Sequence, residues 1–356
     1  ARRGFKLPRA RRARRARGNL NPRLAVDFNT WWAAQTEDTC ETCLRFTKTE
    51  LLMLHQGLRV PPVIRLDNKT CVPGLKALVI VLLHLATAAN QRDITHAFGY
   101  SQSMISRIIT AFYRHHLPQA KRLTLFQHTN FIASRVPMYV AAISRVTGYS
   151  TNTFGFLDGT LRACANPTNG AHLRLYTGFI KRCAIKFMGA NTPDGLLWLD
   201  GPYAGSAHDW NVYGQTPWHG ELANINAAVR VLHPNLAPAL YNLYGDAAFK
   251  AQGYICAPFD MRQLQGASRA QISSAMRFNA GMRRARVTVE WQFGQIVNSF
   301  QQVGFDYNNR YFQTKFMSDY VFAAYLLNCR TCIRGGNITS AYFGVAPPSL
   351  ATYLAL

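Results

Sequence analysis

The sequence Phe-Gly-Phe-Leu-Asp-Gly-Thr, residues 154–160, decides the fold prediction for this chain. Phe154, Phe156 and Leu157 form a short apolar run, which is typical of a strand covered on both faces. The run predicts a strand that ends at the carboxylate of Asp158. A charge in this position needs compensation. Hydrogen bonds from nearby N–H groups in an Asx turn would provide it, and so would a divalent metal ion.

Length and composition are typical of a folded protein that binds a polyanion. The 356 residues are 48% hydrophobic, which is enough for two domains with a sizeable core. The chain has 40 Lys and Arg against 17 Asp and Glu, a formal net charge of +23. This excess points to nucleic acid first and to an anionic membrane surface second. The longest apolar run, Ala77 to Leu83, is too short to cross a bilayer, and we expect no membrane partner.

A basic arm precedes the part of the chain that is predicted to fold. Nine of the first 17 residues are Lys or Arg, and none is acidic. We expect residues 1–20 to be disordered, and to contact phosphates, to act as a nuclear address, or to do both. A solvated tail with no specific role is the alternative. The arm has no apolar core behind it, so it does not resemble a secretory signal.

Residues 21–148 predict an all-helical region. The pattern is helical from Leu24 to Leu58, where Thr47 and Glu50 are spaced as a capping box. Residues 118–148 read as a helical connector. Between these two segments lies a trio of predicted helices, at about 75–89, 91–98 and 101–115.

The third helix of the trio has one apolar face and one polar face, and Ser101 is placed to cap its start. The pattern is typical of a helix-turn-helix, at about 75–115, whose third helix enters a major groove. Any small three-helix bundle has the same pattern. The apolar stripe consists of Ile105, Ile108, Ile109 and Phe112, and the candidate base-reading residues are Gln102, Ser103, Ser106 and Arg107.

The chain changes character at Asn152. Strands followed by helices predict a mixed α/β domain over residues 149–335, with a C-terminal tail at 336–356. The strand-like runs are 154–158, 173–180, 182–190, 196–200 and 240–245, and a basic helix follows at about 282–300.

Acidic residues are scarce, so their positions are informative. Asp158 and Asp246 each follow an apolar run, and Glu290 lies in a helical segment rich in arginine. An exposed ion pair between Glu290 and Arg286, one turn earlier, is the simple interpretation, and such a pair contributes little. The alternative is that the three carboxylates converge on divalent ions. Oxygen ligands suit Mg²⁺ or Mn²⁺, and two such ions about 4 Å apart can act on a phosphodiester.

A set of motifs occurs in a fixed order between about residues 150 and 330. They are Phe156-Leu157-Asp158-Gly159-Thr160, Tyr176-Thr177-Gly178 with Lys181, Pro193-Asp194-Gly195, Gly201-Pro202 to His208-Asp209, Tyr244-Gly245-Asp246, and Arg286 to Gly294 with Glu290-Trp291. As a set they resemble the DDE nuclease domain of PIF/Harbinger-type transposases and the related Harbinger transposase-derived nuclease. The closing stretch, Asn328 to Pro348, resembles the tail of some fungal members.

The resemblance implies an RNase H-like fold, in which a mixed sheet is flanked by helices. It implies that Asp158, Asp246 and Glu290 are the DDE triad of a two-metal site for Mg²⁺ or Mn²⁺, and that Asp209 is a further metal contact. The chain departs from the family at Val297, where a lysine is often found. The basic contact with DNA is then absent or supplied elsewhere, and the candidates are Arg283, Arg284 and Arg286.

The sequence therefore predicts a transposase-like, metal-dependent DNA endonuclease and strand-transferase that cuts phosphodiester bonds at transposon ends in the nucleus. The alternative is a domesticated or silenced DNA-binding protein that keeps the DDE fold without turnover. We expect a homo-oligomer on DNA, and the resemblance adds a Myb-like helper protein as a partner. Cys40-x-x-Cys43 and Cys329-x-x-Cys332 each have the spacing of half a zinc site, although we favour reduced structural cysteines.

Overall fold

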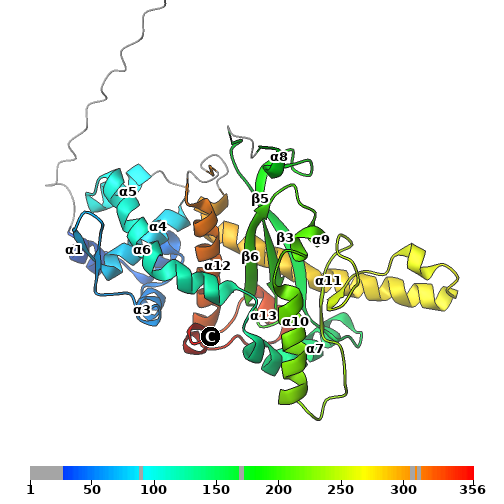
Figure 1. Ribbon diagram of the computed structural model, residues 1–356. Coiled ribbons are helices and arrows are strands. Elements are labelled where there is room, and N and C mark those ends of the chain that lie inside the picture. Colours follow the sequence, from blue (N-terminus) through cyan, green and yellow to red (C-terminus); the bar gives the residue numbers. More distant parts are fainter. Residues whose placement is uncertain (1–26, 88–90, 168–171, 305–308, 311–313) are drawn as a thin grey trace, which may run out of the picture.

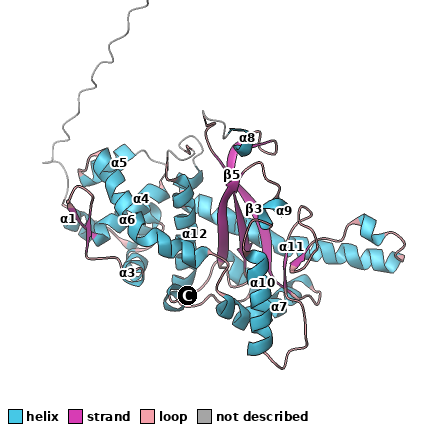
Figure 2. Ribbon diagram, in the orientation of Figure 1, coloured by secondary structure: helices cyan, strands magenta, loops and turns pink. Residues whose placement is uncertain are grey.

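The computed structural model describes residues 27–87, 91–167, 172–304, 309–310 and 314–356 (Figure 1). The predicted basic arm, residues 1–20, lies outside these ranges. A helical region packs beside a mixed sheet that is flanked by helices (Figure 2). None of the helices in the described ranges is long and apolar enough to cross a membrane.

The helical region contains the predicted elements and one hairpin that the sequence pattern did not reveal. The capping box of Thr47 and Glu50 is present at the start of α3. The hairpin pairs β1 (Val63–Arg65) with β2 (Cys71–Pro73). The helices are α1 (Phe28–Ala34), α2 (Glu37–Leu44), α3 (Lys48–Gly57), α4 (Gly74–Ala86), α5 (Gln91–Phe98), α6 (Gln102–Thr124) and α7 (Thr129–Thr147).

The predicted helical trio is α4, α5 and α6. The Ser101 hydroxyl accepts a hydrogen bond from the Met104 N–H and caps α6, and the predicted apolar stripe of α6 is buried. The helix continues beyond its predicted end, through Pro118, to Thr124. It does so because its apolar positions also continue, and Ala120 and Leu123 are fully buried.

The sheet mixes parallel and antiparallel pairs. Strand β5 runs antiparallel to β3, β4 and β6, whereas β7 runs parallel to both β3 and β8. The prediction of a mixed α/β domain is therefore confirmed. The strands are β3 (Thr153–Ala163), β4 (Tyr176–Thr177), β5 (Arg182–Asn191), β6 (Leu197–Ala204), β7 (Asn242–Tyr244) and β8 (Ile255–Cys256).

Two strand predictions were wrong in detail. Asp158 does not end its strand, because β3 stays paired with β5 as far as Ala163. The predicted strand at 173–180 is instead the short helix α8 (His172–Leu175), the two-residue strand β4 and a turn. Lys181 closes that turn with a φ of 53°, in the left-handed region that no strand residue adopts.

Helices cover both faces of the sheet. On one face, α11 (Arg269–Ser299) places Phe293 against Gly189, and α12 (Phe316–Ile333) packs Tyr320 on Phe187 with ring centroids 4.7 Å apart. On the other face, α7 packs against Trp198 and is itself covered by α10 (Trp218–Leu232). The N-terminal part of α11 projects beyond the sheet (Figure 1).

The C-terminal stretch that was predicted as a tail, residues 336–356, contains α13 (Ile338–Phe343) and α14 (Leu350–Leu354). Phe343 stacks on Phe156 of β3 at 6.0 Å, and Tyr353 is fully buried. This stretch therefore completes the core beneath the strand that carries Asp158.

Candidate active site

Strand register brings two of the predicted carboxylates together. Strands β3 and β7 are parallel neighbours, and Phe156 pairs with Tyr244. Asp158 within β3 and Asp246 just after β7 each come two residues after this pair, so they lie at the same level along the sheet. The cross-strand partner of Asp158 is Gly189, which lies under Phe293 of α11. Side chains directly opposite each other share a face, so Asp158 points to the face that α11 covers.

Arg286 forms hydrogen bonds with both Asp158 and Glu290, the third predicted carboxylate. Its Nη1 donates to Asp158 Oδ2 at 3.1 Å, and its Nη2 donates to Glu290 Oε1 at 2.8 Å. The Arg286 and Asp158 side chains are both 16% exposed, whereas that of Glu290 is 49% exposed. The simple ion pair expected between Arg286 and Glu290 is thus present, but the same guanidinium also bridges to the buried end of the site.

Burial has the largest effect on the pKa of the Asp158 carboxyl group, and its charged neighbours act in both directions. Burial raises the pKa of Asp158 to about 6, and repulsion from Asp246 and Glu290 acts in the same direction. Attraction to Arg286 and a hydrogen bond from the Gly159 N–H at 2.9 Å oppose this rise in the pKa. Asp158 therefore interacts electrostatically with both Asp246 and Glu290, and a further positive charge beside it would favour its ionised form.

Asp246 also has a structural role, because it accepts a hydrogen bond from a backbone N–H group in the turn that follows β7. Its Oδ1 accepts a hydrogen bond from the Ala248 N–H at 2.8 Å, so the turn after β7 fixes one carboxylate oxygen. Gly245 lets this turn close, because a Cβ at that position would lie 2.6 Å from the Phe249 ring. Fixing one oxygen limits the orientations that are open to the other.

The structure does not bring Asp209 together with these three residues. Asp209 begins α9 (Asp209–Tyr213), and a Cβ on Gly159 would lie 2.7 Å from its Oδ1. Neighbouring residues of a strand point to opposite faces, so Asp209 lies on the side of β3 that Asp158 does not face. There it forms an ion pair with Lys186, which is 8% exposed and also donates to the Ala207 carbonyl at 2.6 Å.

The chemistry of the carboxylates fits a divalent metal ion, but their positions in this structure do not form a metal site. The oxygens of Asp158, Asp246 and Glu290 are hard ligands with excess negative charge, as Mg²⁺ and Mn²⁺ require. No group of three or more His, Cys, Asp or Glu side chains is arranged to hold a metal ion in the described ranges. Arg286 gives the physical reason, since it occupies the space between two of the carboxylates. Metal binding would require its guanidinium to release at least one of them.

The predicted DNA-contacting residues lie in two places. Arg283 and Arg284 are exposed on α11 one turn before the site, whereas Arg286 turns inward to Asp158. On α6, Gln102 and Ser103 are exposed, Ser106 is half-buried, and Arg107 pairs with Asp67 of the β1–β2 turn at 2.8 Å. Sequence reasoning missed the Asp67 pair because the hairpin that presents Asp67 has little pattern of its own.

Another motif acidic residue is structural. Asp194 is fully buried, where it accepts a hydrogen bond from the Tyr139 hydroxyl at 2.5 Å and lies 3.3 Å from Arg135 Nε. It anchors the turn between β5 and β6 to α7. The cysteines of the two CxxC pairs are free thiols, with Cys40, Cys329 and Cys332 buried and Cys43 exposed.

Comparison with known proteins identifies the segment that contains the site. Residues 157–328 match the family model of the DDE superfamily endonucleases. The match begins at the residue before Asp158 and includes Asp246 and Glu290. A search of curated proteins and a search of solved structures found no match to the chain. Residues 157–328 therefore resemble the domain of DDE superfamily endonucleases.

Proposed function

We propose that this protein is a transposase-like DNA endonuclease that depends on Mg²⁺ or Mn²⁺. The observation that carries the proposal is the electrostatic interaction of Asp158 on β3 with Asp246 after β7 and Glu290 on α11, inside the segment that matches DDE endonucleases. The net charge of +23 supports DNA as the substrate. A mixed sheet flanked by helices is consistent with an RNase H-like architecture for this domain.

The three carboxylates would hold two ions, which supply an activated water and stabilise the charge that develops on the phosphate. The protein fixes the ligands, because the Gly159 and Ala248 N–H groups each hold one carboxylate oxygen. Attack of water on phosphorus breaks the P–O3′ bond and leaves a 3′-hydroxyl and a 5′-phosphate. We propose that this hydroxyl then attacks a phosphorus of target DNA, which forms a new P–O3′ bond, breaks the P–O3′ bond of the target strand and releases its 3′-hydroxyl, with Arg283 and Arg284 contacting phosphates near the site.

The finer parts of the proposal follow from the motif resemblance. We propose a PIF/Harbinger-type subtype of fungal origin, nuclear localisation, assembly as a homo-oligomer on DNA and a Myb-like helper protein. The helices α4, α5 and α6 would form a helix-turn-helix, and the capped, polar N-terminal end of α6 supports this role. The intact carboxylates support the enzyme over a silenced DNA-binding protein.

A cleavage assay on labelled DNA tests the proposal. The wild type should cut in Mg²⁺ or Mn²⁺ and remain inactive in EDTA, and Asp158→Asn should abolish cutting while DNA binding persists. DNA binding by the wild type without cleavage in either metal would instead identify the protein as a non-catalytic DNA-binding protein.

A further inference from the structure

The hairpin between β4 and β5 forms a protruding tip, residues 173–182. Tyr176 pairs with Cys183 and Thr177 pairs with Arg182, so residues 178–181 form the turn. The base of the tip is held in place, because the Arg174 carbonyl accepts hydrogen bonds from the N–H of Ser206, at 3.4 Å, and from its hydroxyl, at 2.7 Å. The tip is therefore a defined part of the fold.

This tip exposes apolar side chains to an unusual degree. Phe179 is 90% exposed and is the most exposed large hydrophobic side chain in the described part of the chain. Leu173 is 83% exposed, and the Tyr176 ring is 43% exposed. Covering a side chain of the size of Phe179 contributes about 1.5–3 kcal/mol, so a partner that covers the ring would gain affinity.

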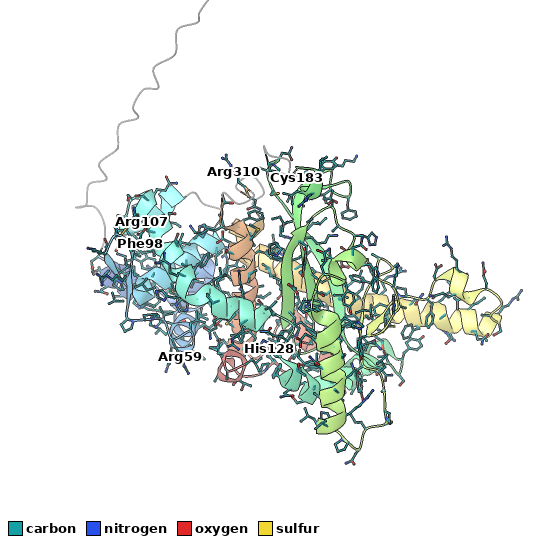
Figure 3. The ribbon with its side chains drawn as sticks, viewed as in Figure 1. Arg59, Phe98, Arg107, His128, Cys183 and Arg310 are labelled. Carbon is teal, nitrogen blue, oxygen red and sulfur yellow. The ribbon has the colours of Figure 1, made fainter. Side chains whose placement is uncertain are left out.

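Exposed cations flank these apolar side chains along the chain. Arg174, Lys181 and Arg182 belong to the tip, and no acidic residue occurs between Asp158 and Asp194. Arg310 lies at the same end of the sheet, because it bridges to Ala165 just beyond β3 (Figure 3). A second copy of a chain with a net charge of +23 would be repelled from this surface, whereas a polyanion would be attracted.

We propose that the tip binds DNA at an unpaired base, on which the ring of Phe179 stacks while the surrounding cations contact phosphates. The inference rests on the proposed DNA substrate and specifies the form of DNA that is bound. Stacking requires an open base face, which single strands and distorted ends offer and regular duplex does not. A surface that contacted only phosphates would need the cations but no exposed ring.

The spacing between the tip and the candidate active site fits one continuous DNA. Arg182 at the base of the turn lies seven residues along β5 from Gly189, the partner of Asp158. At about 3.4 Å per residue this is about 24 Å, or about seven base pairs of B-DNA. One DNA molecule can therefore reach the carboxylates and present an unpaired base to Phe179.

Binding measurements on the full chain in EDTA test this inference without any cleavage. The probes are a regular duplex and the same duplex with a single-stranded overhang. Phe179→Ala should weaken binding to the overhang DNA by about 5- to 150-fold, which corresponds to the loss of one aromatic–base stack, and should leave duplex binding within about twofold. Phe179→Tyr should restore binding. Val231→Ala on α10 is a matched control, because Val231 is also highly exposed, at 78%.

A charge variant tests the second part of the proposal. Lys181→Asn removes a cation and keeps a residue that tolerates the left-handed backbone at this position. It should reduce the slope of log affinity against log salt by about 0.7 on single-stranded DNA.

Three results would overturn the inference while leaving the proposed function intact. They are unchanged overhang binding by Phe179→Ala, an equal loss on both probes, and a change in the oligomeric state of Phe179→Ala measured by light scattering. The last result would show that Phe179 contacts a second copy of the chain. A wild-type protein that binds neither probe would remove the proposed DNA substrate itself.

Discussion

Replacing Arg286 by glutamine tests the electrostatic balance of the candidate site. The variant keeps a polar side chain and removes the only cation that contacts both Asp158 and Glu290 in the described structure. Opposite charges 3.1 Å apart, as in the Arg286–Asp158 pair, attract by about 5 kcal/mol at an effective dielectric constant of about 20. Regained hydration of the unpaired groups offsets part of this energy. The pair with Glu290 is half-exposed and contributes only about 0.5 kcal/mol.

We therefore expect Arg286→Gln to lower the free energy of unfolding by about 2–3 kcal/mol in EDTA at pH 7. Most of this loss should return in saturating Mg²⁺, because the ion supplies the missing positive charge to the same carboxylates. Calorimetry should also show tighter Mg²⁺ binding by the variant, since no guanidinium has to leave Asp158. Denaturant unfolding with and without Mg²⁺ measures the first two effects.

Arg284→Gln is the control for this experiment. Arg284 is an exposed arginine on the same helix, so its loss should change the free energy of unfolding by less than about 0.5 kcal/mol in either buffer. An Arg286→Gln protein as stable as the wild type in EDTA would refute the argument. So would a loss of stability that saturating Mg²⁺ leaves unchanged.

Three further predictions follow from the described residues. Glu290→Gln should leave folding and DNA binding intact and lower metal-dependent cleavage by orders of magnitude, and a wild-type cleavage rate would remove Glu290 from the triad. Gln102→Ala combined with Arg107→Ala should reduce discrimination between specific and random DNA by about tenfold in competition binding, whereas unchanged discrimination would make the helical trio a structural bundle. Burial, aided by repulsion from neighbouring histidines, lowers the pKa of His116 from 6.5 to about 4. The unfolded chain is protonated first, so the stability that neutral His116 confers is complete above pH 6.5 and decreases by about 3 kcal/mol as the pH falls to 4. Unfolding curves of His116→Phe across this range should show a smaller decrease, and an equal one would exclude His116.

Local patterns predicted the elements wherever apolar periodicity was strong. The stripe of Ile105, Ile108 and Phe112 located α6, and the apolar run after residue 153 located β3. The errors arose where long-range pairing or exposure overrode the local pattern. The Asp-Gly pair reads as a strand end, yet hydrogen bonding to β5 carries β3 through it to Ala163. The apolar spacing of residues 173–180 imitates a strand, although Leu173 and Phe179 are exposed.

The candidate site was predictable in its members but not in its contacts. The short apolar runs before Asp158 and Asp246 predicted two strands, and the parallel pairing of Phe156 with Tyr244 brings these acids to the same level. Helical spacing predicts that Arg286 meets Glu290 one turn later. The same spacing cannot predict that Arg286 reaches Asp158, because that contact depends on how α11 crosses the sheet.

The alternation of side chains along β3 explains why four acidic residues of one motif set do not form one cluster. Asp158 faces α11, and the next residue, Gly159, faces α9, where Asp209 fills the space that a side chain at 159 would need. Lys186 neutralises Asp209 on that face, so this pair needs no ion. The Gly159 N–H also donates a hydrogen bond to the Asp158 carboxylate. A substitution that displaced Asp209 would therefore disturb Gly159 and, through this hydrogen bond, the position of the Asp158 carboxylate. The geometry therefore favours Asp209 as a support for Asp158, acting through the strand that separates them.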